Sequence, residues 1–174
     1  KLFVFPLKTR ILLLLVRLSR LVGAMVVAAR EGFVKNAYRT FNITSTELTP
    51  GDDYAMMREV MERRFSHTSD EGWQKPDLLL IDGGLGQVNT VCSVLEETGI
   101  IDIPIVGIAK GPDRNAGKET FIVKGKNPFS LPHNSPTLHL LQRLRDEAHR
   151  FGIAAHRAKR EKNLTKSLLD EVPG

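Results

Sequence analysis

Residues 78–84, LLLIDGG, join a run of four apolar side chains to a carboxylate and a pair of glycines. An apolar run of this length that follows Pro76 and ends at glycines is typical of a strand buried on both faces of a sheet. Ligands of open α/β sheets gather at the carboxyl ends of such strands. The sequence therefore predicts an α/β fold in which Asp82 lies at a functional edge.

The residues that follow extend this strand into a strand, helix, strand unit. Apolar spacing predicts a helix from about Gln87 to Thr98, with Gly99 as its stop, and a second buried strand over 103–109. Units of this kind pair their two strands in parallel. We therefore expect a sheet that is at least partly parallel.

The remaining segments predict further strands and two more helices. Strands are expected over 24–28 and 33–43, and a short hairpin is expected over 120–123 and 128–131. One helix begins after the turn at 49–52, and a long one begins with Ser135 as N-cap and runs to at least Lys159. Residues 66–75 are polar and indicate a loop.

Composition places the chain among globular proteins of a reducing compartment. Its 174 residues, 41% of them hydrophobic, are enough for one domain with its own core. The single cysteine, Cys92, cannot form an internal disulfide and is predicted to be a buried thiol. The apolar run 11–16 is too short to span a bilayer and is followed by Arg17 and Arg20, so we expect a cytoplasmic protein.

The predicted long helix carries two stripes and a basic block. The apolar stripe should pack on the sheet, whereas the polar stripe is either a solvated surface or a group that binds metal, protons or phosphate. The basic block is either a contact surface for nucleic-acid phosphates or a soluble face, and it lacks the aromatic residues that stack on bases. The apolar stripe is Leu141, Leu144, Ala148, Phe151 and Ala155; the polar stripe is Gln142, Arg145, Asp146, His149 and His156; the basic block is Arg143, Arg145, Arg150, Arg157, Lys159, Arg160, Lys162 and Lys166.

The glycines at 83, 84 and 86 fit a nucleotide-binding loop poorly, because the Lys and Ser/Thr of a P-loop are absent. We expect them to admit another backbone or a nucleic-acid strand close to Asp82. Asp82, Asp53 and His149 are groups that a compact α/β domain could bring together for phosphodiester hydrolysis with Mg²⁺ or Mn²⁺. For Asp53, a favourable charge at a helix N-terminus is the alternative interpretation.

Five segments of the chain closely resemble the C-terminal half of the UvrC family of excinuclease proteins, in the same order and with similar spacing. These segments are YRTFNI at 38–43, TPGDDY at 49–54, PDLLLIDGGLGQ at 76–87, IVGIAKG at 105–111 and LLQRLRDEAHRF at 140–151. The resemblance implies a ribonuclease H-like fold, a mixed sheet flanked by helices in a single domain. It also implies a metal-dependent endonuclease that makes the 5′ incision at damaged DNA in nucleotide excision repair, together with excinuclease subunits A and B.

The matched segments assign expected roles to individual residues. Asp82 matches a catalytic, metal-binding aspartate, Asp53 a further acid implicated in function and metal binding, and His149 the catalytic histidine. The divalent metal implied is Mg²⁺ or Mn²⁺. Four basic residues in or beside these segments are candidates, by their charge, for contacts with DNA phosphates: Lys110, Arg143, Arg145 and Arg150.

The chain departs from the family pattern near its N-terminus. Family members begin this domain with an aromatic-Asp-x-Ser-His strand, whose aspartate should fall near Leu12, yet no carboxylate precedes Glu31. We therefore divide the chain into an atypical segment over 1–21, an endonuclease domain over 22–168 and the start of a linker over 169–174. A catalytically inactive DNA-binding module is the alternative function, and a nucleotide-binding α/β domain is a weaker third one.

Overall fold

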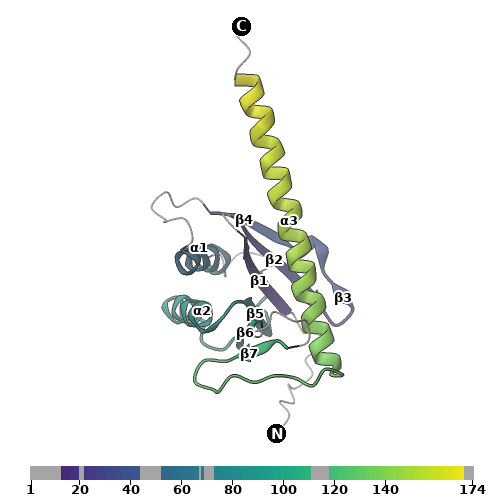
Figure 1. Cartoon of the computed structure of the whole chain (residues 1–174). Helices are drawn as coiled ribbons and strands as arrows, with labels where there is room; N and C mark the ends of the chain where they lie inside the picture. Colours follow the sequence, from purple (N-terminus) through teal and green to yellow (C-terminus); the bar gives the residue numbers. More distant parts are fainter. Residues whose placement is uncertain are drawn as a thin grey trace.

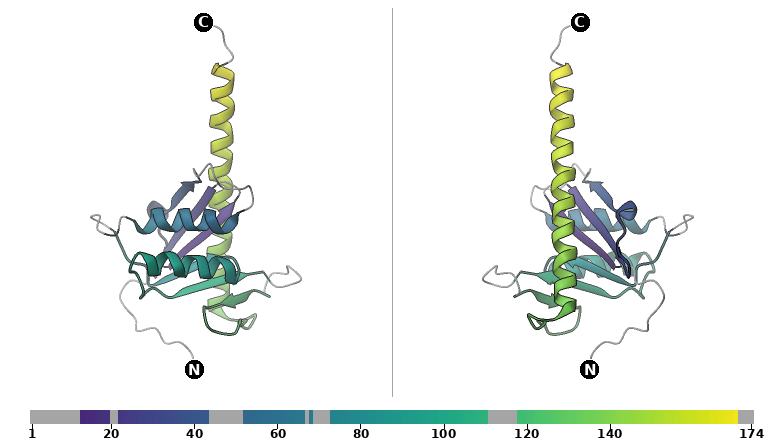
Figure 2. Two further views of the ribbon diagram at one scale, coloured as in Figure 1. Left: turned by 90° about the vertical axis from the view of Figure 1, so that its left-hand side faces the viewer. Right: turned by 90° about the vertical axis from the view of Figure 1, so that its right-hand side faces the viewer.

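The computed structural model describes residues 13–19, 22–43, 52–66, 68, 73–110 and 118–170. These residues form a seven-stranded mixed sheet that separates two layers of helices. Helices α1 and α2 lie side by side on one face, and the long helix α3 crosses the other (Figures 1 and 2). The C-terminal turns of α3 project beyond the edge of the sheet (Figure 1).

The sheet combines a parallel centre with antiparallel edges. Its order is β3-β2-β1-β5-β6-β7, and β4 pairs with β2 beside β3. Strand β5 is parallel to both β1 and β6, and the other pairs are antiparallel. The predicted α/β fold is thereby confirmed. The strands are β1 (Leu13–Ser19), β2 (Val22–Ala29), β3 (Gly32–Phe33), β4 (Arg39–Asn42), β5 (Leu78–Asp82), β6 (Ile105–Ala109) and β7 (Thr120–Ile122).

Helices α1 and α3 begin where the sequence predicts, because polar side chains cap their first turns. The Asp52 carboxylate accepts a hydrogen bond from the Ala55 amide at 3.0 Å, and the Ser135 hydroxyl accepts one from the Leu138 amide at 3.4 Å. Gly99 follows α2 with a φ of 76°, the left-handed conformation that ends helices. The helices are α1 (Asp53–Phe65), α2 (Leu85–Glu97), α3 (Pro136–Asp170) and the short 3₁₀ helix η1 (Lys35–Ala37).

Two of the predicted strands differ from the structure. The continuous strand expected over 33–43 is wrong, because η1 divides it into two strands, β3 and β4, which pair with β2 separately. Local alternation gave no sign that Tyr38 turns to pack on Phe151 of α3, with ring centroids 5.1 Å apart. The expected hairpin over 120–131 is reduced to β7 and a single bridge between Phe121 and Phe129.

Strand β1 lies in the middle of the sheet and comes from the leucine-rich segment that precedes Val22. It pairs with β5 from Leu13↔Leu78 to Val16↔Ile81. Leu12, the expected place of the family aspartate, lies outside the described residues. The division of the chain at residues 21 and 168 stays a prediction.

The core is apolar on both faces of the sheet. Met57, Val60 and Val88 of the α1/α2 layer have no exposed surface, and neither has Leu144 of α3. Cys92 is buried as predicted, and burial raises the pKa of its thiol. Among the helices of the described part of the chain, none has the length and apolar character needed to cross a membrane.

Candidate active site at the carboxyl edge of the sheet

Asp82 ends β5 and faces the layer of α3. A Cβ atom added to Gly107 would lie 2.6 Å from Cγ2 of Val88, so Gly107 faces α2. Ile81 pairs with Gly107, and Asp82 pairs with the next residue, Ile108. Because successive residues of a strand point to opposite faces, Asp82 and Ile108 point toward α3.

Glu119 lies on the same face and at the same edge of the sheet. Asp82 pairs with Ile108 of β6, and Ile108 pairs with Phe121 of β7, so the three side chains point to the same face. Glu119 comes two residues before Phe121, just ahead of β7, and therefore points to that face as well. The Glu119 side chain is almost fully buried, at 3% exposure. A second carboxylate therefore stands near the carboxyl end of β5, and the sequence analysis did not identify it.

Two side chains of α3 hold Glu119. Arg145 donates from Nη2 to Oε1 at 2.9 Å, and Gln142 donates from Nε2 to both carboxylate oxygens at 3.3 and 3.2 Å. Burial opposes the charge of Glu119, but hydrogen bonds from its own backbone amide and from Gln142, with the charge of Arg145, outweigh burial and lower its pKa. Glu119 is therefore held as a carboxylate. The only sign of Glu119 in the sequence was the placement of Arg145 and Gln142 on one face of the predicted helix, where they could bind a carboxylate.

His149 lies on α3 between two contacts that fix the helix over the sheet. It is one turn after Arg145 and close to one turn before Gly152, where an added Cβ atom would lie 3.3 Å from Cβ of Ala24. Met25, Val16 and Ile81 form one row across the sheet, and Ala24 and Asp82 are each one residue from it, so both point to the face of α3. His149, which is exposed, therefore lies on the same side of the sheet as Asp82 and near the same part of the carboxyl edge.

A second polar contact anchors α3 on its opposite side. The Tyr38 hydroxyl donates to Glu147 at 3.0 Å, and Arg150 donates to the same carboxylate at 2.7 Å. Burial, followed by the hydrogen bond to Glu147, raises the pKa of Tyr38 to about 12. Tyr38 therefore ties the segment before β4 to the helix that carries His149, a role that the sequence analysis missed.

Asp53 lies in the other helical layer. It is the first residue of α1 and is exposed. Its neighbour Tyr54 packs on Gly86, where an added Cβ atom would lie 2.4 Å from the tyrosine ring. Since Gly86 is in the first turn of α2, which follows β5 directly, Asp53 is near the same edge as Asp82 but across the sheet from α3.

The donor set available at this edge suits a divalent cation only in part. Carboxylate and imidazole groups are common ligands of Mg²⁺ or Mn²⁺ sites. Within the described ranges, however, no three or more His, Cys, Asp or Glu side chains form a group that could hold a metal ion. The pairing of β1 with β5 ends at Val16↔Ile81, one residue before Asp82. The described residues alone do not complete a metal site.

The glycines after Asp82 have separate roles. Gly83 lies close to the backbone of β6, as expected, and its amide donates to the carbonyl of Ile108 at 3.1 Å. The amide of Gly84 donates to Oε1 of Gln87 at 3.1 Å and so helps to start α2. Gly86 accommodates the side chain of Tyr54 and so serves the packing of α2 on α1. The approach of a nucleic-acid strand stays a prediction.

Three of the four expected phosphate contacts are exposed. Lys110 follows β6 at the carboxyl edge, and Arg150 keeps 64% of its side chain exposed beside Glu147. Arg143 lies over the ring of Phe33, 5.9 Å from its centroid. Arg145 differs, because only 12% of its side chain is exposed and its guanidinium pairs with Glu119.

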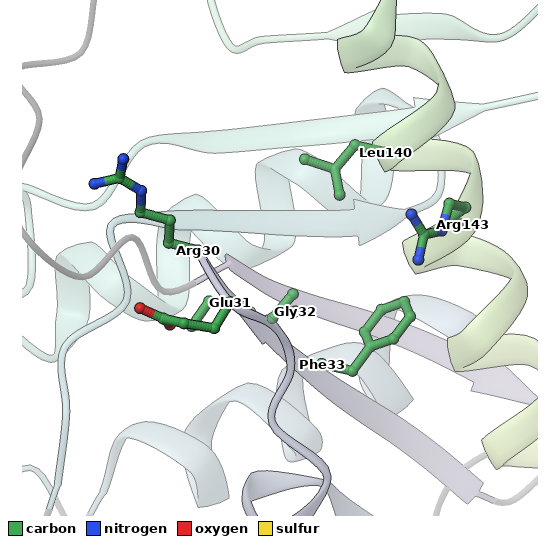
Figure 3. A pocket seen from close by; sticks show the side chains of 8 residues that line it. Arg30, Glu31, Gly32, Phe33, Leu140 and Arg143 are labelled. Atoms are coloured by element: carbon green, nitrogen blue, oxygen red, sulfur yellow. The ribbon is translucent and has the colours of Figure 1, made fainter.

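Arg143 also lines a cleft between α3 and the turn after β2. The cleft has a volume of about 390 Å³ and lies between Leu140 and Arg143 on one side and Arg30 to Phe33 on the other. Figure 3 shows the side chains of Arg143 and Phe33 facing one another there. Ala28, which also lines the cleft, is four residues along β2 from Ala24, so the cleft lies away from the row of Asp82.

Comparison with known proteins identifies the domain. The family model for the UvrC RNAse H endonuclease domain matches residues 16–153. The chain is 60% identical over 158 residues to the UvrABC system protein C of Rhodospirillum rubrum, which covers 88% of this chain and 25% of that protein. It is 58% identical over 161 residues to that of Paramagnetospirillum magneticum, which covers 90% and 26%. Among solved structures, that of human ENDOV has a TM-score of 0.44 at 17% identity, covering 60% of this chain and 47% of that one.

The fold and the family match define a ribonuclease H-like endonuclease domain. The chain belongs to the UvrC family. It spans about a quarter of the length of the curated relatives that it matches.

Proposed function

We propose that the chain is the endonuclease domain of a UvrABC-type excinuclease, which hydrolyses a phosphodiester bond on the 5′ side of a lesion in nucleotide excision repair. One observation carries the proposal: the family match covers the strand that places Asp82 at the carboxyl edge and the helix that carries His149 above it. In this proposal the domain acts on damaged double-stranded DNA together with excinuclease subunits A and B.

Each residue of the carboxyl edge has a separate proposed role. Asp82 offers the carboxylate for Mg²⁺ or Mn²⁺, and such an ion, when bound, would polarise the phosphoryl group. His149 is exposed on α3 and can accept or donate a proton at that edge, or act as a ligand of the same ion. Asp53 would contribute from the N-terminus of α1, and Lys110, Arg143 and Arg150 would hold the DNA backbone.

A catalytically inactive DNA-binding module is the second candidate function. It is favoured by the lack of a three-residue metal group in the described ranges and by the lack of any Asp or Glu before Glu31 in the sequence. An apolar or basic side chain cannot replace an anionic ligand of a divalent cation. In such a module Lys110, Arg143 and Arg150 would still bind DNA through its phosphates.

An incision assay separates the two functions. The chain is mixed with excinuclease subunits A and B, Mn²⁺ and a duplex with a single lesion, and nicks are mapped on the damaged strand. The endonuclease predicts a nick 5′ of the lesion that is lost in Asp82→Asn. Absence of any nick, with DNA binding that weakens steeply as salt rises, would establish the inactive module.

Two gain-of-function variants sharpen this assay. Leu12→Asp restores a carboxylate where the family sequence places it, and Arg17→Asp introduces one in β1, one residue after the Val16↔Ile81 pair. If the chain is inactive for want of that ligand, one of the two variants will gain incision. The matched controls are Leu12→Asn and Arg17→Asn, which place a neutral amide at the same positions and should gain none.

A further inference from the structure

Glu119 is a buried charge that the proposed chemistry does not use. It lies on the same face of the sheet as Asp82 and at the same edge, yet its oxygens are occupied by Arg145 and Gln142 of α3. Both partners precede His149 on the same helix, Gln142 by seven residues and Arg145 by four. The carboxylate therefore joins the edge of the sheet to the part of α3 that carries the histidine.

Stability alone does not account for this pair. Burying an ion pair costs so much desolvation that well-packed apolar residues often do as well or better. Here the pair is also incompletely satisfied, because Nη1 of Arg145 is buried and has no hydrogen-bond partner in the described part of the chain. The pair instead fixes the orientation of α3, because a planar guanidinium binds a carboxylate with a defined geometry that apolar contacts lack.

The contacts of α3 fix its rotation about its own axis. Arg145 and Glu147 are about 200° apart around a helix of 3.6 residues per turn, and they bind on opposite sides, to Glu119 and to Tyr38. His149 is about 40° from Arg145 in the same projection. Any rotation of α3 that moves His149 away from the carboxyl edge must break the contact with Glu119.

We propose that Glu119 is a positioning residue for the site of Asp82 and His149, acting through Arg145 and Gln142. It holds the polar face of α3 over the carboxyl edge and so sets where the imidazole lies relative to the carboxylate. This inference rests on the proposed function, because it assigns Glu119 a role in the same site.

The test replaces the ion pair with an apolar pair, which separates a positioning role from a contribution to stability. Glu119→Leu combined with Arg145→Met removes the charges but keeps the volume, and the Tm should stay within a few degrees of the wild type. If Glu119 positions the site, Mn²⁺ binding measured by water-proton relaxation should nevertheless weaken by about tenfold, as is usual when a residue that orients a metal ligand is lost. Mn²⁺ binding that matches the wild type in this folded double variant would overturn the proposal.

A matched control removes an ion pair elsewhere. Arg58→Met with Glu97→Leu deletes the pair between α1 and α2, and Mn²⁺ binding should not change. Should the wild type bind no Mn²⁺, the metal-dependent function fails, and the positioning role is then judged on metal-free protein. Backbone amide shifts of residues 146–152 should move in the Glu119 and Arg145 double variant and not in the control; unmoved shifts would overturn the proposal on their own.

Discussion

The two faces of the sheet are built differently. On the face of α1 and α2, the contacts are apolar, and Met57, Val60, Met61 and Val88 have no exposed surface. On the face of α3, Leu144 and Ala148 are equally buried, but the layer also encloses the carboxylate of Glu119 near Asp82. The face of α1 and α2 is an apolar core, whereas the face of α3 combines an apolar core with a buried polar contact at the carboxyl edge.

One ion pair from each layer shows the difference. Arg58 bridges α1 and α2 through Glu97, and both side chains are more than a third exposed. Arg145 reaches Glu119 beneath α3, where the exposures are 12% and 2%. The first pair lies on the surface, and the second is part of the interior. The predictions below test this division.

Removal of one partner of the buried pair should give the largest loss of stability. Glu119→Ala leaves the guanidinium of Arg145 buried without its counter-charge, and such changes cost about 3–5 kcal/mol. The measurement is the free energy of unfolding in urea. A loss below about 1 kcal/mol would mean that the pair behaves like a surface contact, which would remove the difference between the faces.

A cavity in the layer of α1 and α2 should lower the free energy of unfolding nearly as much, but it should leave the polar edge under α3 unchanged. Met57→Ala removes a fully buried side chain of α1, and truncations of this kind cost about 2–5 kcal/mol. Amide shifts of residues 146–152 on α3 should stay as in the wild type. Shifts that move there as much as in Glu119→Ala would show that the two layers respond as one.

The contact between Tyr54 and Gly86 gives a smaller effect. Gly86→Ala places a Cβ atom 2.4 Å from the tyrosine ring; because Tyr54 is 54% exposed and can turn aside, the loss should lie at the low end of the range of about 1–3 kcal/mol for overpacking. Gly84→Ala is the matched control, since its nearest neighbour would be 3.8 Å away. Thermal unfolding of the two variants measures the difference, and equal melting temperatures would contradict the described packing of α2 on α1.

The buried carboxylate should also set a pH dependence. Because the pKa of Glu119 is lowered in the folded state, its contribution is present above the unfolded pKa of about 4 and is lost as the pH falls below it. The stability advantage of the wild type over Glu119→Gln should therefore shrink below about pH 4. Urea unfolding from pH 3 to pH 7 measures this, and a constant difference would mean that Glu119 titrates as it does when unfolded.

The exposed pair of the α1/α2 layer should give the smallest effect. Arg58→Ala is expected to cost less than about 1 kcal/mol, because solvent and salt screen exposed ion pairs. Its effect should fade further at high salt. A salt-independent loss of several kcal/mol would place this pair in the same class as Arg145 and Glu119.

Local patterns predicted much of the fold and the first residue of the site. The run 78–82 is β5, the apolar stripe of the long helix is its buried face, and Asp52 and Ser135 cap their helices as expected. Each of these features depends on residues within one or two turns of each other. They are therefore legible in a single sequence.

The features that escaped prediction depend on distant residues. Glu119 is 26 residues from Arg145, and Tyr38 is 109 residues from Glu147, so neither pairing has a local pattern. The break at η1 has the same origin, since Tyr38 leaves the sheet edge to reach α3. For the same reason the sequence grouped Asp53 with His149, although α1 and α3 lie on opposite faces (Figure 2).

Paramagnetic broadening by Mn²⁺ tests the central claim, that Asp82 and His149 share the α3 side of the carboxyl edge. The account predicts that substoichiometric Mn²⁺ broadens the imidazole signals of His149 and the amides next to Asp82 together, and that Asp82→Asn abolishes both effects. Broadening confined to the first turn of α1 around Asp53, with His149 unaffected, would contradict it.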